Sequence, residues 1–146
     1  MAEGLPMDIV ECTSDDQIAS TFIVMHQLRP HLVEADYVPL VREISSQGGR
    51  LIGAFDQGQC TGCALFRRET RLFTGPLIYI DDLVADEAVR SGGIGSALLG
   101  WIEEFAKQHS VETIALDSAV HRGVTHKFYF RNGFTITSFN FKKPIK

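Results

Sequence analysis

The chain of 146 residues has the length of one domain, since a single hydrophobic core usually holds about 100–150 residues. Its hydrophobic share of 45% and charged share of 22% are ordinary for a globular protein, and ten phenylalanines argue against disorder. A formal net charge of −4 lacks the basic excess of proteins that bind phosphate backbones, so nucleic acid is not an expected ligand. The acidic excess instead favours cationic partners.

The sequence shows no sign of a membrane or secreted protein. No stretch approaches the run of about 18 apolar residues that a membrane span needs, and residues 1–6 lack the features of a secretory signal. Three cysteines do not suggest a disulfide framework, so we expect a cytoplasmic location. Cys60 and Cys63 form a lone C-x-x-C, either a redox pair or half a zinc site, or two small residues beside a hairpin turn. No second C-x-x-C or paired histidine follows, which favours the hairpin.

Strands and helices are expected to alternate along the whole chain. Ser14 and Gln17 form a capping box at a helix start, and Gly48–Gly49 is typical of a helix end. The spacing of apolar residues assigns the other elements. Predicted strands span 7–13, 51–55, 60–67, 77–84, 114–116 and 134–141, and predicted helices span 15–28, 36–47, 94–108 and 121–131. This order predicts a mixed α/β protein without internal repeats.

The glycine cluster Gly92, Gly93 and Gly95 stands between a strand and a long helix. Glycine permits positive φ and close approach of a ligand, and the free N–H groups of a helix start suit an anion. Residues 90–96 therefore form either a pyrophosphate cradle or simply a tight turn. A dinucleotide fingerprint is excluded because no further G-x-x-G step follows, and a nucleotide P-loop because no Lys follows Gly95.

Two motifs at the right distance resemble the GNAT superfamily of N-acetyltransferases. Arg90-x-x-Gly93-x-Gly95 is similar to its acyl-CoA signature, and Phe128–Phe134 is similar to its second hallmark, F-Y-x-x-x-G-F. The resemblance covers residues 8–141, and we expect a single N-acetyltransferase domain over 1–146 with that core. It implies a mixed, mostly antiparallel sheet opened into a V and flanked by helices.

The resemblance also implies how acetyl-CoA, the cosubstrate, would be held. Backbone amides of the signature loop would bind its pyrophosphate, and the end of the preceding strand would pair with its pantetheine arm. Arg122 stands where the family often has Asn, and could meet a phosphate of CoA or lie in solvent. The implied CoA-binding residues are Leu83, Val84, Ala85, Arg90, Ser91, Gly92, Gly93, Ile94, Gly95, Ser96 and Arg122.

Three further residues are candidates for catalysis. Tyr129 falls on the family's usual general acid, where a phenol protonates the departing thiolate. Asp81 and Asp82 are similar to an acidic pair in the diamine and polyamine acetyltransferase branch. Adjacent strand residues point to opposite faces, so only one faces the acceptor unless a bulge intervenes. Because Asp is a weak base, ammonium recognition or a water relay is the favoured role.

The resemblance therefore predicts direct acetyl transfer in a ternary complex to a primary amine, with a small cationic amine favoured as acceptor. No metal is implied, and the cysteines lie outside the motifs, so none is needed as an acyl carrier. The family often dimerises, which leaves a homodimer open. The alternatives are a CoA-binding regulatory module without turnover, a protein N-terminal or lysine acetyltransferase, and a nucleotide-binding protein.

Overall fold

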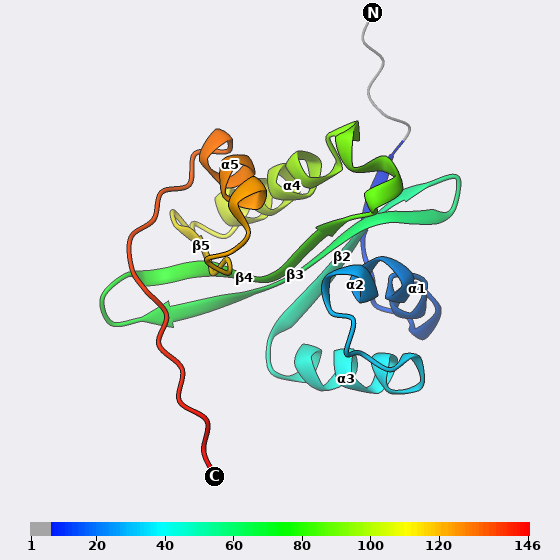
Figure 1. Ribbon diagram of the computed structural model, residues 1–146, viewed down its shortest axis with the longest axis horizontal. Coiled ribbons are helices and arrows are strands. Elements are labelled where there is room, and N and C mark those ends of the chain that lie inside the picture. Colours follow the sequence, from blue (N-terminus) through cyan, green and yellow to red (C-terminus); the bar gives the residue numbers. More distant parts are fainter. Residues whose placement is uncertain (1–6) are drawn as a thin grey trace, which may run out of the picture. The chain divides into compact units, whose positions relative to one another are not determined.

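The computed structural model describes residues 7–146, except for the side chains of Arg90 and Ser91. It divides into two compact units, one up to Ala115 and one from Leu116 onward, which are described separately. The elements in chain order are β1 (Asp8–Glu11), α1 (Asp15–Ser20), α2 (Phe22–Leu28), α3 (Glu34–Ser46), β2 (Gly49–Asp56), β3 (Gln59–Arg71), β4 (Gly75–Ala85), the 3-10 helix η1 (Glu87–Gly92), α4 (Ile94–Gln108), β5 (Ile114–Leu116) and α5 (Gly123–Arg131) (Figure 1).

The sheet has the order β1-β2-β3-β4-β5, and each of the first four strands is antiparallel to its neighbour. The chain passes from β4 to β5 through α4, the kind of crossover that parallel neighbours require. Helices pack on both faces of the sheet in the first unit (Figure 1). The predicted α/β class, with a mixed and mostly antiparallel sheet flanked by helices, is confirmed.

The two sheet faces have different cores because strand side chains alternate. On one face, α1, α2 and α3 pack against side chains such as Leu51, Leu65 and Val84. On the other face, α4 covers Phe66, whose ring centroid lies 5.2 Å from that of Phe105. Apolar burial on both faces holds β3 and β4 in the interior of the unit.

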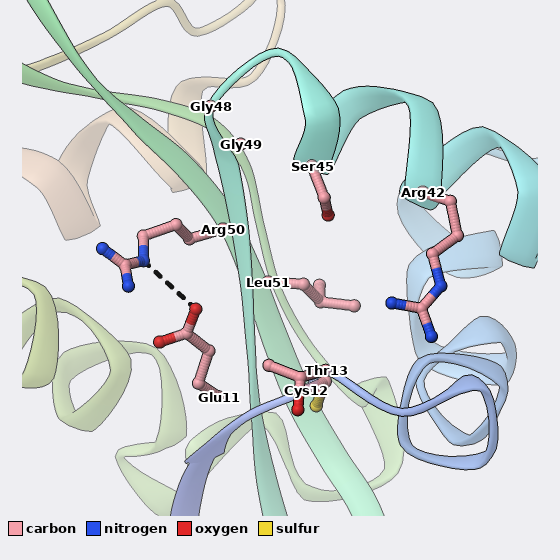
Figure 2. Close-up of a pocket in the computed structure, with 9 residues that line it drawn as sticks. All are labelled: Glu11, Cys12, Thr13, Arg42, Ser45, Gly48, Gly49, Arg50 and Leu51. Atoms are coloured by element: carbon pink, nitrogen blue, oxygen red, sulfur yellow. Dashed lines mark hydrogen bonds and ion pairs between the residues drawn. The ribbon is translucent and has the colours of Figure 1, made fainter.

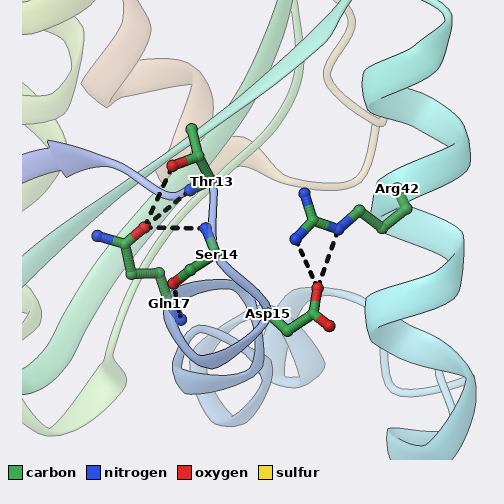
Figure 3. Close-up of polar contacts among 5 residues, drawn as sticks. All are labelled: Thr13, Ser14, Asp15, Gln17 and Arg42. Carbon is green, nitrogen blue, oxygen red and sulfur yellow. Dashed lines mark hydrogen bonds and ion pairs between the residues drawn. The ribbon is translucent and has the colours of Figure 1, made fainter.

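The region predicted as one helix over 15–28 is two helices that meet at Thr21. The capping box is present: the Ser14 side chain accepts from the N–H of Gln17, whose amide oxygen accepts from the N–H of Ser14 (Figure 3). The break has a local cause, since the Thr21 hydroxyl donates to the Ile18 carbonyl at 2.8 Å and lies 2.7 Å from the Tyr37 hydroxyl. A side-chain bond of this kind competes with the regular helix ladder.

Both hairpins of the sheet differ in length from the sequence-based expectation. Gln57 and Gly58 have φ of 50° and 79°, the two-residue turn whose twist suits antiparallel strands, and they join β2 to β3. The strand predicted over 60–67 continues to Arg71 and pairs with β4 as far as Gly75. The polar residues at its end pair in a hairpin, which periodicity of apolar residues does not reveal.

The second unit contains α5 and the segment that follows it. Gly133, with φ of 87°, ends the helix as expected, because only glycine adopts this conformation freely. The strand predicted over 134–141 was wrong, since none of these residues is in a strand. Phe139 and Phe141 are 80% and 92% exposed, so the alternating pattern has no buried face to support it. Core burial, the expected use of these phenylalanines, is therefore not observed.

No helix within residues 7–146 has both the length and the apolar character that crossing a bilayer requires.

The contribution of Phe66 to stability can be tested by substitution. Phe66→Ala removes a ring that is 0% exposed and leaves a cavity beneath α4, so it should lower the free energy of unfolding by about 3–5 kcal/mol. Phe73→Ala at the exposed hairpin tip is the matched control and should cost less than about 0.5 kcal/mol. Urea denaturation checks both, and equal losses would contradict the assignment of Phe66 to the core.

Candidate active site

The glycine cluster lies where β4 gives way to α4. After η1, Gly93 has φ of 79° and ψ of 13°, a left-handed conformation that glycine adopts without strain, and it is the N-cap of α4. The next residue, Ile94, is buried and anchors the helix start: a Cβ on Gly62 would lie 2.5 Å from its Cγ2 atom. The fifteen-residue helix therefore begins at a fixed point, with its first N–H groups beyond the glycine turn.

This arrangement has the features of an anion site. Gly92 and Gly95 are half-buried, Gly93 and Ser96 are exposed, and an α-helix N-terminus carries a partial positive charge. The N-cap residue of α4, Gly93, makes no side-chain cap bond. The predicted contributions of the Arg90 and Ser91 side chains lie outside the described residues.

The predicted pantetheine strand, residues 83–85, forms the last part of β4. Leu83, Val84 and Ala85 pair with Ala64, Cys63 and Gly62 of β3. The opposite edge of β4 faces β5, which is only three residues long against eleven in β4, so β5 cannot run along that whole edge. Near the start of β4, the N–H of Ile78 donates to the carbonyl of Thr113, the residue before β5, at 2.9 Å.

The acidic pair, Asp81 and Asp82, lies at a β-bulge. A bulge allows two adjacent strand residues to face the same side of the sheet, which a regular strand does not. Leu65 pairs with Asp82 and Phe66 pairs with Ile80, so Asp81 is an extra residue without a partner in the register. A bulge re-aims side chains and is common next to active sites.

Each carboxylate of the pair contacts its own arginine. The Nε atom of Arg29, at the C-terminal end of α2, donates to Asp82 Oδ1 at 2.8 Å, and one of its terminal nitrogens donates to the Asp81 carbonyl at 3.1 Å. The Nε atom of Arg67 on β3 donates to Asp81 Oδ2 at 2.9 Å. The negative charge of the pair is therefore largely compensated within the protein.

Burial and pairing act in opposite directions on Asp81. Partial burial raises the pKa of its carboxyl above the ordinary value, and the bond from Arg67 offsets only part of this rise. A carboxylate with a raised pKa is a stronger base than an ordinary aspartate, which suits a proton relay at this position.

Sequence reasoning missed Arg29 and Arg67 as parts of this site. Arg29 precedes a proline at a helix end and Arg67 was expected at the end of a strand, so neither had a motif. Only the pairing of β3 with β4 and the docking of α2 bring them to the acidic pair. The available signal was physical: two adjacent acids on a mostly apolar strand need cationic partners.

The second unit holds the predicted general acid. Tyr129 lies on α5, half-buried, with its ring centroid 5.4 Å from that of Phe128 and 5.6 Å from that of Phe134. These edge-on contacts fix the plane of its ring. Arg122 is exposed at the N-cap of α5 and makes no side-chain cap bond. Their roles remain predictions.

All three cysteines are free and buried. Cys60 and Cys63 lie on β3 directly after the turn that joins it to β2, which agrees with the favoured prediction of two small residues beside a hairpin turn. Burial raises the pKa of Cys12 to about 11. The hydrogen bond between Cys60 and Cys63 lowers the pKa of Cys60. Within the part of the chain that the structure describes, no group of His, Cys, Asp and Glu side chains is arranged to hold a metal ion.

A cavity of about 350 Å³ is lined by residues of the first unit, and none of these lining residues is a predicted site residue (Figure 2). It lies between the ends of β1 and α3 and the start of β2. Its two arginines are already paired, Arg50 with Glu11 at 3.1 Å and Arg42 with Asp15 (Figures 2 and 3). We therefore do not assign it to the reaction.

Comparison with known proteins decides the family. The sequence profile of the Acetyltransferase (GNAT) family matches residues 16–134. The chain belongs to this family. The predicted GNAT relationship is thus confirmed, and the chain is an acetyl-CoA-dependent N-acetyltransferase. Its placement near the diamine and polyamine branch stays a prediction.

Two curated N-acetyltransferases are similar in sequence to this GNAT protein. An N-acetyltransferase of Bacillus subtilis, YhdJ, described as uncharacterized, is 26% identical over 137 residues, covering 92% of this chain and 96% of the relative. The aminoalkylphosphonate N-acetyltransferase of Salmonella typhimurium is 38% identical over 66 residues, a local match covering 45% of this chain and 43% of the relative.

Solved structures share the GNAT fold at low sequence identity. The aminoglycoside N-acetyltransferase AAC(6′)-Iy in complex with CoA superposes with a TM-score of 0.85 at 16% identity, covering 100% of this chain and 99% of the other. At that identity the likeness shows the fold alone.

The ion pair between Arg29 and Asp82 can be measured by a double-mutant cycle. The two side chains are 41% and 18% exposed, so Arg29→Met, Asp82→Asn and the double variant should reveal a coupling of about 1–2 kcal/mol in urea unfolding. The exposed pair Arg42 and Asp15 is the matched control and should couple by less than about 0.5 kcal/mol. Additive losses at Arg29 and Asp82 would show that the pair does not tie α2 to β4.

Proposed function

We propose that this GNAT enzyme transfers the acetyl group of acetyl-CoA directly to a small primary amine at the end of β4. The observation that carries the proposal is the left-handed Gly93 at the fixed start of the long helix α4, directly after the strand that ends at Ala85. A cradle of this shape fits a pyrophosphate, because backbone N–H groups and the helix dipole favour negative charge without a bulky side chain in the way.

The proposed CoA site uses backbone more than side chains. The N–H groups of residues 90–96 would hold the pyrophosphate, and the edge of residues 83–85 would pair with the pantetheine arm as an added strand. The short β5 supports the second contact, because it leaves much of the β4 edge uncovered by a strand. Arg122 is proposed as a further phosphate contact from the second unit.

Acetyl-CoA supplies an activated acyl group, and the chain must supply an acid, a proton path and a donor for the carbonyl oxygen. The amine nitrogen forms a bond to the thioester carbon, and the carbon–sulfur bond breaks. We assign the proton given to the departing thiolate to the Tyr129 hydroxyl. The proton lost by the amine passes to solvent through water held at Asp81 or Asp82, and Tyr129 regains its proton from solvent. A backbone N–H near Leu83 would stabilise the carbonyl oxygen.

The charge of the acceptor has two candidate answers. The acidic pair favours a cationic amine such as a diamine or polyamine, as the sequence suggests. The arginines favour an amine that also carries an acidic group, because their contacts to Asp81 and Asp82 use only part of the five N–H donors of each guanidinium. The local match to an aminoalkylphosphonate N-acetyltransferase supports this second candidate.

An acceptor panel tests the proposal. Release of the CoA thiol from acetyl-CoA should depend on an added amine, and we would compare a diamine, a polyamine, an aminoglycoside, a 1-aminoalkylphosphonate and an N-terminal peptide at matched concentrations. Turnover with the first three supports the cationic class, whereas turnover with the phosphonate alone supports the acidic class. Tight acetyl-CoA binding without release for any amine would favour a regulatory module and contradict the enzyme assignment.

The role of Tyr129 has its own test. Tyr129→Phe keeps the ring and its packing but removes the hydroxyl, so it should lower kcat by about 10²-fold while leaving CoA affinity unchanged. Tyr37→Phe is the matched control: it removes a buried hydroxyl bonded to Thr21, which should lower stability but leave kcat within about twofold. Steady-state kinetics and CoA titration check both. Unchanged turnover in Tyr129→Phe would remove this residue from the mechanism.

A further inference from the structure

The last turn of α2 is joined to the segment that leads from β4 into the glycine loop. The Gln27 side chain makes two bonds there: its Nε2 atom donates to Asp86 Oδ1 at 3.1 Å, and its Oε1 atom accepts from the N–H of Glu87 at 3.0 Å. The Gln27 amide thus contacts the side chain of Asp86 and the backbone of the next residue, Glu87. These are the cap and the first residue of η1.

Asp86 joins this contact to the backbone of the loop. The same Oδ1 atom that Gln27 contacts also accepts from the N–H of Ala88 at 3.1 Å, and the N–H of Asp86 donates to the Thr61 carbonyl at 2.8 Å. The Asp86 carbonyl accepts from the N–H of Val89 at 3.0 Å. Asp86 is therefore the point at which the chain turns from β4 toward Gly93, and Gln27 fixes its side chain from outside the loop.

The same turn of α2 also holds β4 itself. Arg29, two residues after Gln27, contacts Asp82 and the Asp81 carbonyl. The contacts of Gln27 and Arg29 thus lie on either side of residues 83–85, the proposed pantetheine edge. Movement of this turn would shift the strand end and the start of the loop together.

We propose that Gln27 is a positioning residue for acetyl-CoA, which holds Asp86 and Glu87 so that the backbone amides leading to Gly93 stand ready for the pyrophosphate. The inference rests on the proposed function, because it assumes that this loop is the CoA cradle. Gln27 acts through the loop and needs no contact with CoA. Loss of the Gln27 side chain should lower the affinity for CoA, because a loop without these two bonds must be ordered when CoA binds, and this ordering costs free energy.

The first test compares Gln27→Ala with wild type by titration with CoA and by steady-state kinetics. Loss of two solvent-exposed bonds should raise the Kd for CoA and the KM for acetyl-CoA by about 3–10-fold, with the KM for the amine within twofold. Gln47→Ala, an exposed glutamine at the end of α3, is the matched control and should change neither constant. Thermal unfolding of each variant shows that the fold is intact.

A repulsive substitution and a double-mutant cycle test the contact itself. Gln27→Glu removes the donor and places a second carboxylate beside Asp86, so it should weaken CoA binding more than Gln27→Ala does. Asp86→Ala and the double variant Gln27→Ala/Asp86→Ala complete a cycle on the Kd for CoA, in which the two losses should be less than additive because both single changes remove the same bond. Additive losses would overturn the proposed contact.

Failure of the proposed function gives a different pattern. If wild type binds no CoA, or if Gly93→Leu binds it as well as wild type does, the cradle assignment fails and the role of Gln27 fails with it. If wild type binds CoA and Gly93→Leu does not, while Gln27→Ala binds as wild type, the cradle stands and the positioning role alone is overturned.

Discussion

Charge on a covered strand is the constraint that organises this molecule. Helices of the first unit pack on both faces of β4, yet its C-terminal half carries the half-buried Asp81 and Asp82. Carboxylates in such surroundings require hydrogen-bonded cationic partners, because desolvation of an unpaired charge is costly. Arg29 and Arg67 meet that requirement. In doing so, Arg29 joins the end of α2 to the strand, so the pair that suggests a reaction also helps to assemble the fold around it.

The elements that could be predicted are those in which a local rule and burial agree. The Ser14 capping box, the glycine turn before α4 and the short strand at 114–116 are all present. Thr21 shows the limit of apolar spacing: Ile18, Phe22 and Met25 suggest one continuous helix, but a hydroxyl bond to the backbone divides it. Residues 134–141 show the opposite error, in which alternation occurs without a partner strand.

The site divides in the same way. The glycine turn proposed as the cradle could be predicted, because glycine is favoured at a left-handed position such as Gly93 and this preference is visible in one sequence. The bulge at Asp81 could be considered but not placed, since it depends on the register between β3 and β4. The contacts of Gln27 and Arg29 could not be predicted from the sequence, because their partners lie more than fifty residues away along the chain and the residues next to them form no recognisable motif.

The three buried thiols described above have a practical consequence for work on this enzyme. Reagents that colour on reaction with free thiols must reach the sulfur atom, and all three thiols are buried, so each reacts slowly in the folded protein, including Cys60, whose pKa is lowered. The folded protein should therefore give little thiol signal of its own, so that the release of CoA can be followed continuously with such a reagent. The same property reverses on unfolding, when Cys12, Cys60 and Cys63 all meet solvent. Thiol colour without substrate thus reports the unfolded fraction of a preparation.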